Sequence, residues 1–252
     1  MKRVETKADL NKFPAELHGL LQAGKIYDSS CSTEARTLYC EAGYYIKIAP
    51  KGALASEAMM GRLFHQLGLG VEVLEYLSSD RDYLVTRSAD GEDLTHHLED
   101  PENLCRVMAE GLRKLHSQSV AGAPVSAKLS GYADLSGFNE YLRMDYIGIH
   151  SREEAVAVID ANRGRLTSDT LIHGDACLPN IICRDGEFST FIDCGLAGRG
   201  DRHIDLFWAI WSLQFNLKTE AYTDRFLDLY GRDRVDFEML RTVAALELLG
   251  GE

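Results

Sequence analysis

The sequence predicts an α+β protein of two lobes, a smaller strand-rich lobe followed by a larger helical one. Three observations predict this: alternating apolar residues before residue 88, helical apolar stripes after it, and a strand–turn–strand pattern around Asp185-Gly186. The chain has 252 residues, which is enough for each lobe to bury a core of its own. We therefore expect an N-terminal lobe over 1–88 and a C-terminal lobe over 89–252.

The first lobe is predicted from a strand and the helix that follows it. Residues 44–48 predict a strand with its apolar side chains on one face and Lys47 on the other. Residues 53–67 predict a helix that ends at Gly68. Its apolar stripe consists of Met60, Leu63, Phe64 and Leu67. Glu57 lies at the edge of that stripe, where a carboxylate needs a partner, and Lys47 is the obvious candidate.

The remaining elements follow from the same periodicities. Residues 71–77 and 83–86 predict two strands joined through 78–81. After Ala89-Asp90-Gly91 the pattern becomes helical, and further helical segments are expected over 203–248. The clearest stripe in the second lobe is Leu104, Val107, Met108, Leu112 and Leu115.

One predicted hairpin brings chemically useful side chains together. Asp185-Gly186 is a two-residue turn signal between two apolar runs. With that turn, Asn180 pairs with Phe191, and Asp193 lies one diagonal step away, within roughly 8 Å. An amide and a carboxylate at such a separation can hold one divalent cation. Asp175 lies in the loop that leads into the first strand.

Bulk composition excludes several classes of protein. The formal net charge of -12 argues against a nucleic-acid partner and is compatible with a cationic substrate, although it can equally serve solubility alone. No apolar run approaches the roughly 20 residues that span a bilayer, so no membrane partner is expected. The N-terminus lacks the apolar core of a secretory signal. We expect a cytoplasmic protein whose six cysteines are reduced thiols, without a zinc site.

The order of three motifs is the order that protein kinases use. His173-Gly174-Asp175, Asn180 and Asp193-Cys194-Gly195 match a catalytic base, a metal-binding Asn and a metal-binding Asp. On 173–180 and 191–195 the chain resembles the aminoglycoside phosphotransferases, most closely the 3′-phosphotransferases that inactivate kanamycin and neomycin. The resemblance continues at Gly198, Asp201-Arg202, Asp205 and 225–231, and more weakly upstream through Leu112 to Ser117, Ala89 to Gly91, Glu57, Lys47 and Ser30 to Ser32.

The resemblance implies a two-lobed protein-kinase-like fold that binds ATP, or GTP in its place, with Mg²⁺. Lys47, held by Glu57, would contact the α- and β-phosphates. Asn180 and Asp193 would bind magnesium, and Asp175 would be the catalytic base that accepts the proton of the substrate hydroxyl. Two further segments would hold the nucleotide, a turn over the phosphates and a backbone contact to adenine: Ser30, Cys31 and Ser32, and Arg87 to Ala89.

The substrate half departs from the family pattern. Leu196 follows the Asp-x-Gly motif where the 3′-phosphotransferases usually carry Arg, and Asp145 is the only acid in a stretch where many of them have several. Trp211-Ser212 replaces an Arg-Asp pair, while the C-terminal acid survives as Glu247. Asp145, Trp211 and Glu247 are the expected substrate residues. Fewer carboxylates suit an acceptor with fewer ammonium groups, with Trp211 as an apolar wall.

Together these features predict an enzyme that transfers the γ-phosphoryl group of ATP to a hydroxyl of a small cationic molecule. The first expectation is the 3′-hydroxyl of an aminoglycoside, and hence antibiotic resistance. Two alternatives remain: a kinase of another hydroxylated metabolite or antibiotic, and a catalytically idle nucleotide-binding protein with a kinase-like fold. The protein is expected to be a monomer or a homodimer.

Overall fold

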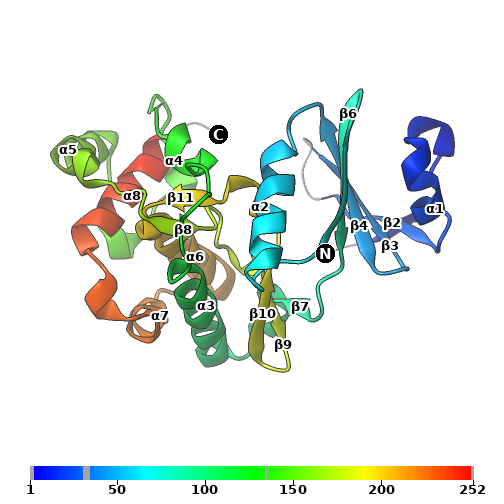
Figure 1. Cartoon of the computed structure of the whole chain (residues 1–252). Coiled ribbons are helices and arrows are strands. Elements are labelled where there is room, and N and C mark those ends of the chain that lie inside the picture. The colour runs from blue at the N-terminus through cyan, green and yellow to red at the C-terminus, as the bar shows by residue number, and fades with distance from the viewer. Residues whose placement is uncertain (1–2, 31–34, 134, 251–252) are drawn as a thin grey trace. The chain divides into compact units, whose positions relative to one another are not determined.

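The chain divides into two compact units, Met1–Ala89 and Asp90–Glu252 (Figure 1). The computed structural model describes residues 3–30, 35–133 and 135–250. Both units combine strands with helices, which is the α+β composition expected from the sequence.

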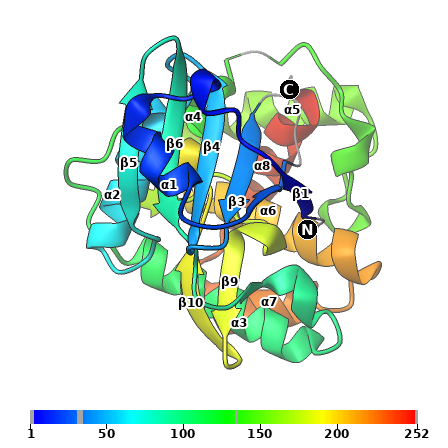
Figure 2. The same ribbon diagram turned by 90° about the vertical axis from the view of Figure 1, so that its right-hand side faces the viewer.

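The first unit is built on an antiparallel sheet of six strands, in the order β1-β2-β3-β4-β6-β5. The strands are β1 Val4–Thr6, β2 Ile26–Asp28, β3 Arg36–Cys40, β4 Tyr44–Pro50, β5 Val73–Ser78 and β6 Arg81–Arg87. Figure 2 shows β5, β6, β4 and β3 side by side in this order. The predicted strands over 44–48, 71–77 and 83–86 are therefore confirmed as β4, β5 and β6.

Two sets of apolar side chains cover the two faces of this sheet. Tyr44, Ile46 and Ile48 of β4 are buried on one face, beside the short helix α1 (His18–Leu21), as their alternation predicts. Lys47 lies on the opposite face, which α2 (Ala55–Gln66) covers (Figure 1). The remaining helical turns of this unit are the 3₁₀ segments η1 Leu10–Lys12 and η2 Ala15–Leu17.

Helix α2 ends as the sequence predicts. Gly68 adopts a left-handed conformation with φ of +70°, which glycine accepts without steric cost. Met60 and Phe64 of the expected stripe are fully buried, while Leu63 and Leu67 are half-buried at its edge. This orientation places Glu57, one turn before Met60, close to the sheet.

The second unit consists mainly of helices, with two small sheets ordered β10-β9-β7 and β11-β8. Its strands are β7 Glu92–Asp93, β8 Thr170–Ile172, β9 Ile181–Arg184, β10 Glu187–Phe191 and β11 Gly198–Gly200. Its α-helices are α3 Pro101–His116, α4 Ala127–Gly131, α5 Arg152–Asn162, α6 Arg202–Leu217, α7 Thr223–Tyr230 and α8 Phe237–Leu249. Short 3₁₀ turns connect them: η3 Leu94–His97, η4 Glu140–Leu142, η5 Asp145–Ile147, η6 Arg163–Arg165, η7 Leu178–Asn180, η8 Cys194–Leu196 and η9 Arg232–Arg234.

Helix α3 supports the hairpin that carries the site. Asp100 caps its first turn by accepting a hydrogen bond from the Asn103 amide, and the five residues of the predicted stripe are all fully buried. Gly111 faces the hairpin, and a Cβ at this position would lie 2.6 Å from the Phe188 ring. The absence of a side chain here lets α3 approach β10 closely.

The hairpin turn is confirmed, but the predicted register is wrong by one residue. Asp185 and Gly186 both have positive φ, +52° and +79°, as a type I′ turn requires. A bulge between Phe188 and Thr190 leaves one residue unpaired, so Phe191 faces Ile181 rather than Asn180. The Asn180 carbonyl instead accepts a hydrogen bond from the Ile192 amide (3.0 Å).

Candidate active site

A buried carboxylate anchors the loop that carries Asp175. Strand β8 leads directly into His173 and Gly174, whose backbone amides each donate a 2.8 Å hydrogen bond to Asp205 of α6. His116, at the end of α3, donates a further bond to Asp205 from Nε2 (3.0 Å). Asp205 is fully buried, so these three donors replace the water that its charge has lost. The carboxylate thereby ties the loop to two helices.

Gly174 has a conformation and a setting that only glycine satisfies. Its φ is +85°, and a Cβ would lie 2.5 Å from the carbonyl oxygen of Leu196. The loop therefore packs its backbone directly against the segment that follows Asp193. The ring of His173 makes a second link, because its Nε2 donates to the carbonyl of Ile192 (2.9 Å). His173 is fully buried and acts as a structural link beneath the loop.

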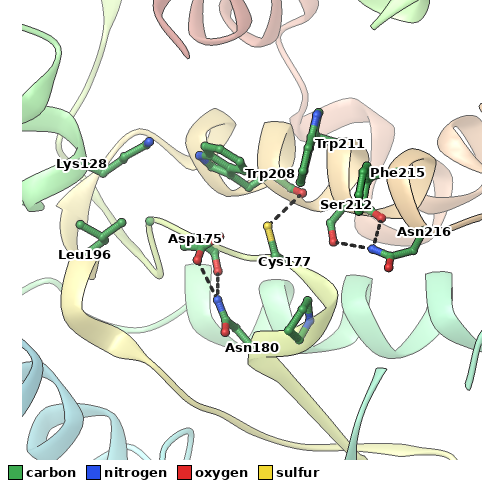
Figure 3. Close-up of a pocket in the computed structure, with 12 residues that line it drawn as sticks. Lys128, Asp175, Cys177, Asn180, Leu196, Trp208, Trp211, Ser212, Phe215 and Asn216 are labelled. Atoms are coloured by element: carbon green, nitrogen blue, oxygen red, sulfur yellow. Dashed lines mark hydrogen bonds between the residues drawn. The ribbon is translucent and has the colours of Figure 1, made fainter. Parts of the chain in front are cut away.

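Asn180 holds the carboxylate of Asp175. Its Nδ2 donates to the Asp175 side chain (Oδ2, 2.9 Å) and to the Asp175 carbonyl (3.0 Å), as the dashed lines in Figure 3 show. The amide nitrogen is thus used within the loop, and the amide oxygen is the atom of Asn180 suited to bind a cation. Asp175 is half-buried. This donor set fits a hard divalent cation, which prefers oxygen ligands.

Asp193 adopts a conformation that is uncommon for a residue with a side chain. Its φ is +58°, in the left-handed region, and it is exposed just before the turn η8. Ile192, its neighbour, pairs with Asn180 through the backbone. Asp193 was expected one diagonal step from Asn180. In the shifted register it instead directly follows the residue that pairs with Asn180. Aspartate enters this region more readily than most residues, and here the conformation lets the chain turn directly into η8.

A pocket of about 470 Å³ opens beside Asp175, within the second unit. One wall consists of aromatic residues of α6, where Trp211 and Phe215 stack with ring centroids 5.0 Å apart. Cys177 lies on the floor, and burial together with the nearby Asp175 raises the pKa of its thiol well above the usual value. The full lining is Lys128, Gly174, Asp175, Cys177, Pro179, Asn180, Leu196, Trp208, Trp211, Ser212, Phe215 and Asn216.

Glu247 lies behind this pocket and not in its lining. It is 5% exposed and accepts hydrogen bonds from three side chains: Lys128 (2.8 Å), Trp208 Nε1 (2.9 Å) and the Tyr132 hydroxyl (2.6 Å). Burial and the carboxylate of Glu247 raise the pKa of Tyr132 well above its usual value, so its hydroxyl remains a donor. Glu247 therefore has a full set of partners from the chain itself.

In the first unit, Lys47 and Glu57 form the predicted ion pair. The Lys47 Nζ lies 2.8 Å from Glu57 Oε2, and both side chains are largely buried. Ser30 is exposed, and its hydroxyl bonds to Asp28 (2.7 Å) in the turn after β2. Cys31 and Ser32 lie outside the described residues.

The expected adenine segment begins at the end of β6. The backbone amide of Arg87 donates to the carbonyl of Glu72, and that of Ser88 to the carbonyl of Gly43, so both donors are used within the first unit. Ala89 follows as a half-buried residue.

The expected substrate residues occupy three different settings. Trp211 lines the pocket, Glu247 supports its wall, and Asp145 lies exposed in the turn η5, outside the lining. Sequence reasoning missed Lys128 and Phe215, which both line the pocket. Phe215 could have been found, since it lies one helical turn after Trp211. Lys128 is in a segment without clear periodicity, and its sequence offers no signal.

The chain is similar to known proteins in both sequence and structure. Residues 32–242 match the model of the phosphotransferase enzyme family. The "Probable aminoglycoside 3'-phosphotransferase" of Lactococcus lactis subsp. lactis is 41% identical over 98% of both chains. The aminoglycoside 3′-phosphotransferase of Streptomyces fradiae is 29% identical over 78% of this chain and 81% of its own.

Solved structures show the same fold. The aminoglycoside phosphotransferase APH(3″)-Id of Streptomyces rimosus superposes with a TM-score of 0.70 at 22% identity, covering 87% of this chain and 92% of its own. A type VIII aminoglycoside 3′-phosphotransferase gives 0.68 at 23% identity, covering 88% and 91%. The predicted protein-kinase-like fold is thereby confirmed. No helix in the described part of the chain is long and apolar enough to cross a membrane. By its sequence, its fold and the order of its motifs, the chain belongs to the phosphotransferase enzyme family.

Proposed function

We propose that the protein transfers the γ-phosphoryl group of ATP to the 3′-hydroxyl of an aminoglycoside, with Mg²⁺ as the required cation. The observation that carries this proposal is the clamp of Asn180 on Asp175 at the edge of the pocket. It holds one carboxylate in the lining of the pocket and leaves an amide oxygen beside it. The Lactococcus relative, at 41% identity over nearly the whole chain, supports the choice of acceptor.

The roles of the side chains follow from the balance of the reaction. The acceptor hydroxyl oxygen forms a bond to the γ-phosphorus, the bond to the β,γ-bridging oxygen breaks, and ADP leaves. Asp175 accepts the proton of the hydroxyl, and it needs only a hydrogen bond to that group, because positioning contributes most of the rate. Bound magnesium would neutralise charge on the phosphates, with Asn180 and Asp193 as its ligands.

The ion pair of the first unit supports nucleotide binding. Lys47 supplies a cation for the phosphates, and Glu57 orients it at 2.8 Å. A lysine that was only solvated would not need a partner that is 13% exposed. We propose that the backbone at Ala89 contacts the adenine and that Ser30 lies in the turn over the phosphates.

The test is a coupled assay of ADP release with kanamycin and neomycin, with and without Mg²⁺. We expect turnover in the wild type, loss of transfer with retained ATP binding in Asp175→Asn, and weaker ATP binding in Lys47→Met. Lys25→Met is a matched control, because Lys25 forms an exposed pair with Glu5 in the same unit. Turnover by Asp175→Asn at the wild-type rate would contradict the assigned base.

One observation favours a second candidate, a kinase of a less charged hydroxylated compound. Asp175 is the only carboxylate that lines the pocket among the described residues, and the aromatic wall of Trp211 and Phe215 is apolar. Phosphorylation of neutral sugars or amino alcohols, without turnover of any aminoglycoside, would establish this alternative.

A further inference from the structure

We propose that Lys128 selects the acceptor by charge. Lys128 forms an ion pair with the buried carboxylate of Glu247. The acceptor therefore presents an uncharged oxygen, and not an ammonium group, to this wall of the pocket. The proposal rests on the proposed function for the identity of the acceptor. The structure places the two groups together, because the Lys128 Nζ of α4 lies 2.8 Å from Glu247 Oε2 of α8, and Lys128 also lines the pocket. In Figure 3 the Lys128 side chain points toward Trp208.

The pair is asymmetric in its exposure. The side chain of Lys128 is 22% exposed, whereas that of Glu247 is 4% exposed. The ammonium group therefore meets the pocket, and the carboxylate lies behind it. Since Trp208 and Tyr132 also donate to Glu247, the carboxylate is held in one orientation. A ligand ammonium could reach Glu247 only by displacing Lys128.

Displacement of Lys128 is unfavourable on electrostatic grounds. Its Nζ bonds to Glu247 at 2.8 Å and lies 4.6 Å from the centroid of the Trp208 ring, so the charge has two attractive contacts. A ligand ammonium at the same wall would meet this cation in a partly desolvated site, where like charges repel strongly. A hydroxyl oxygen would instead accept a hydrogen bond from the ammonium group.

A second lysine, outside the pocket lining, lies against the other end of the aromatic wall. Lys218 places its Nζ 4.0 Å from the centroid of Phe215, so the chain supplies the cation at this ring as well. The aromatic surface between the two lysines is formed by Trp211 and Phe215. It suits the apolar face of a sugar ring better than a further ammonium group. Charge and shape therefore point to the same kind of acceptor.

The experiment compares acceptors that differ by one amino group on the ring with the 3′-hydroxyl. Kanamycin A and kanamycin B differ at C2′, and paromomycin and neomycin differ at C6′, each by a hydroxyl against an amino group. For at least one pair we expect the wild type to prefer the hydroxyl compound in kcat/KM. Lys128→Met should shift that preference toward the amino compound roughly tenfold, the worth of a charge-assisted hydrogen bond. Unchanged ratios in both pairs would overturn the proposal.

Two variants separate charge selection from a merely structural role. Lys114→Met breaks a Lys–Glu pair on α3, outside the pocket lining, and should leave both ratios unchanged. Glu247→Gln leaves the ammonium of Lys128 without its counter-charge, so the preference for the hydroxyl compound should grow. If Lys128→Met does not fold, this variant decides the question, and a ratio equal to that of the wild type overturns the proposal.

A binding measurement separates this proposal from the proposed function. If the wild type phosphorylates none of the four acceptors, the proposed function fails, and a titration with 1,3-diaminopropane, followed by tryptophan fluorescence, tests Lys128 alone. Both tryptophans lie on the wall of the pocket. Roughly tenfold tighter binding to Lys128→Met than to the wild type supports charge selection. Equal affinities overturn it.

Discussion

The substitution Asp205→Asn tests whether one buried carboxylate holds the loop that carries Asp175. Oδ1 accepts from the Gly174 amide, and Oδ2 accepts from the His173 amide and from His116. Asparagine keeps a single oxygen. If that oxygen takes the place of Oδ2, the new NH₂ group faces the Gly174 amide and leaves this donor without a partner, at a cost of about 1–3 kcal/mol. The two bonds that remain lose their charge assistance, about 1 kcal/mol each.

The expected loss is therefore about 3–5 kcal/mol of the free energy of unfolding. Urea unfolding followed by tryptophan fluorescence measures this loss. The signal reports on the second unit, which contains Asp205, because both tryptophans lie on the same helix, α6. Transfer should also fall more than the affinity for ATP, since His173 and Gly174 directly precede Asp175. Asp228→Asn, at an exposed pair with Arg232, is the control, with a loss below about 1 kcal/mol. A loss for Asp205→Asn as small as this control would refute the reasoning.

Three further results are expected. Gly174→Ala should abolish transfer and lower the free energy of unfolding by more than about 2 kcal/mol, because its Cβ would lie 2.5 Å from a backbone oxygen. The control Gly148→Ala, in open space at φ +65°, should lower it by about 1 kcal/mol, and denaturation compares the two. Burial raises the pKa of Cys177, so its thiol should resist iodoacetamide at pH values where an ordinary thiol, with a pKa of about 8.5, ionises. The stability that Cys177 contributes should fall as pH rises from that value to the raised pKa. Rapid alkylation at neutral pH would contradict this. Burial alone would raise the pKa of Asp201, but the hydrogen bond with His203 holds that pKa below its usual value. The stability that Asp201 supplies is therefore present above about pH 4 and is lost as pH falls through the lowered pKa. An Asp201→Asn variant with the same acid-unfolding curve as the wild type would argue against this.

Local patterns determined most of the fold. The turn at Asp185-Gly186, the strand of Lys47 and the stripe of α3 follow from dihedral preferences and from the spacing of apolar residues, which act over a few positions. The candidate site was visible because its motifs are short and ordered along the chain. The partner of Lys47 could be predicted for the same reason, since Glu57 lies ten positions away on the next element.

Tertiary packing decided the rest. The bulge in β10 that places Asn180 opposite Ile192 leaves no signal in the sequence. The alternation of residues predicts a strand in either register. The pair of Lys128 with Glu247 joins segments 119 residues apart. The sequence by itself therefore determined which candidate catalytic groups the protein has. Only the folded chain decided the charge of the pocket beside them, because that charge depends on which distant side chains come within a few ångströms of each other.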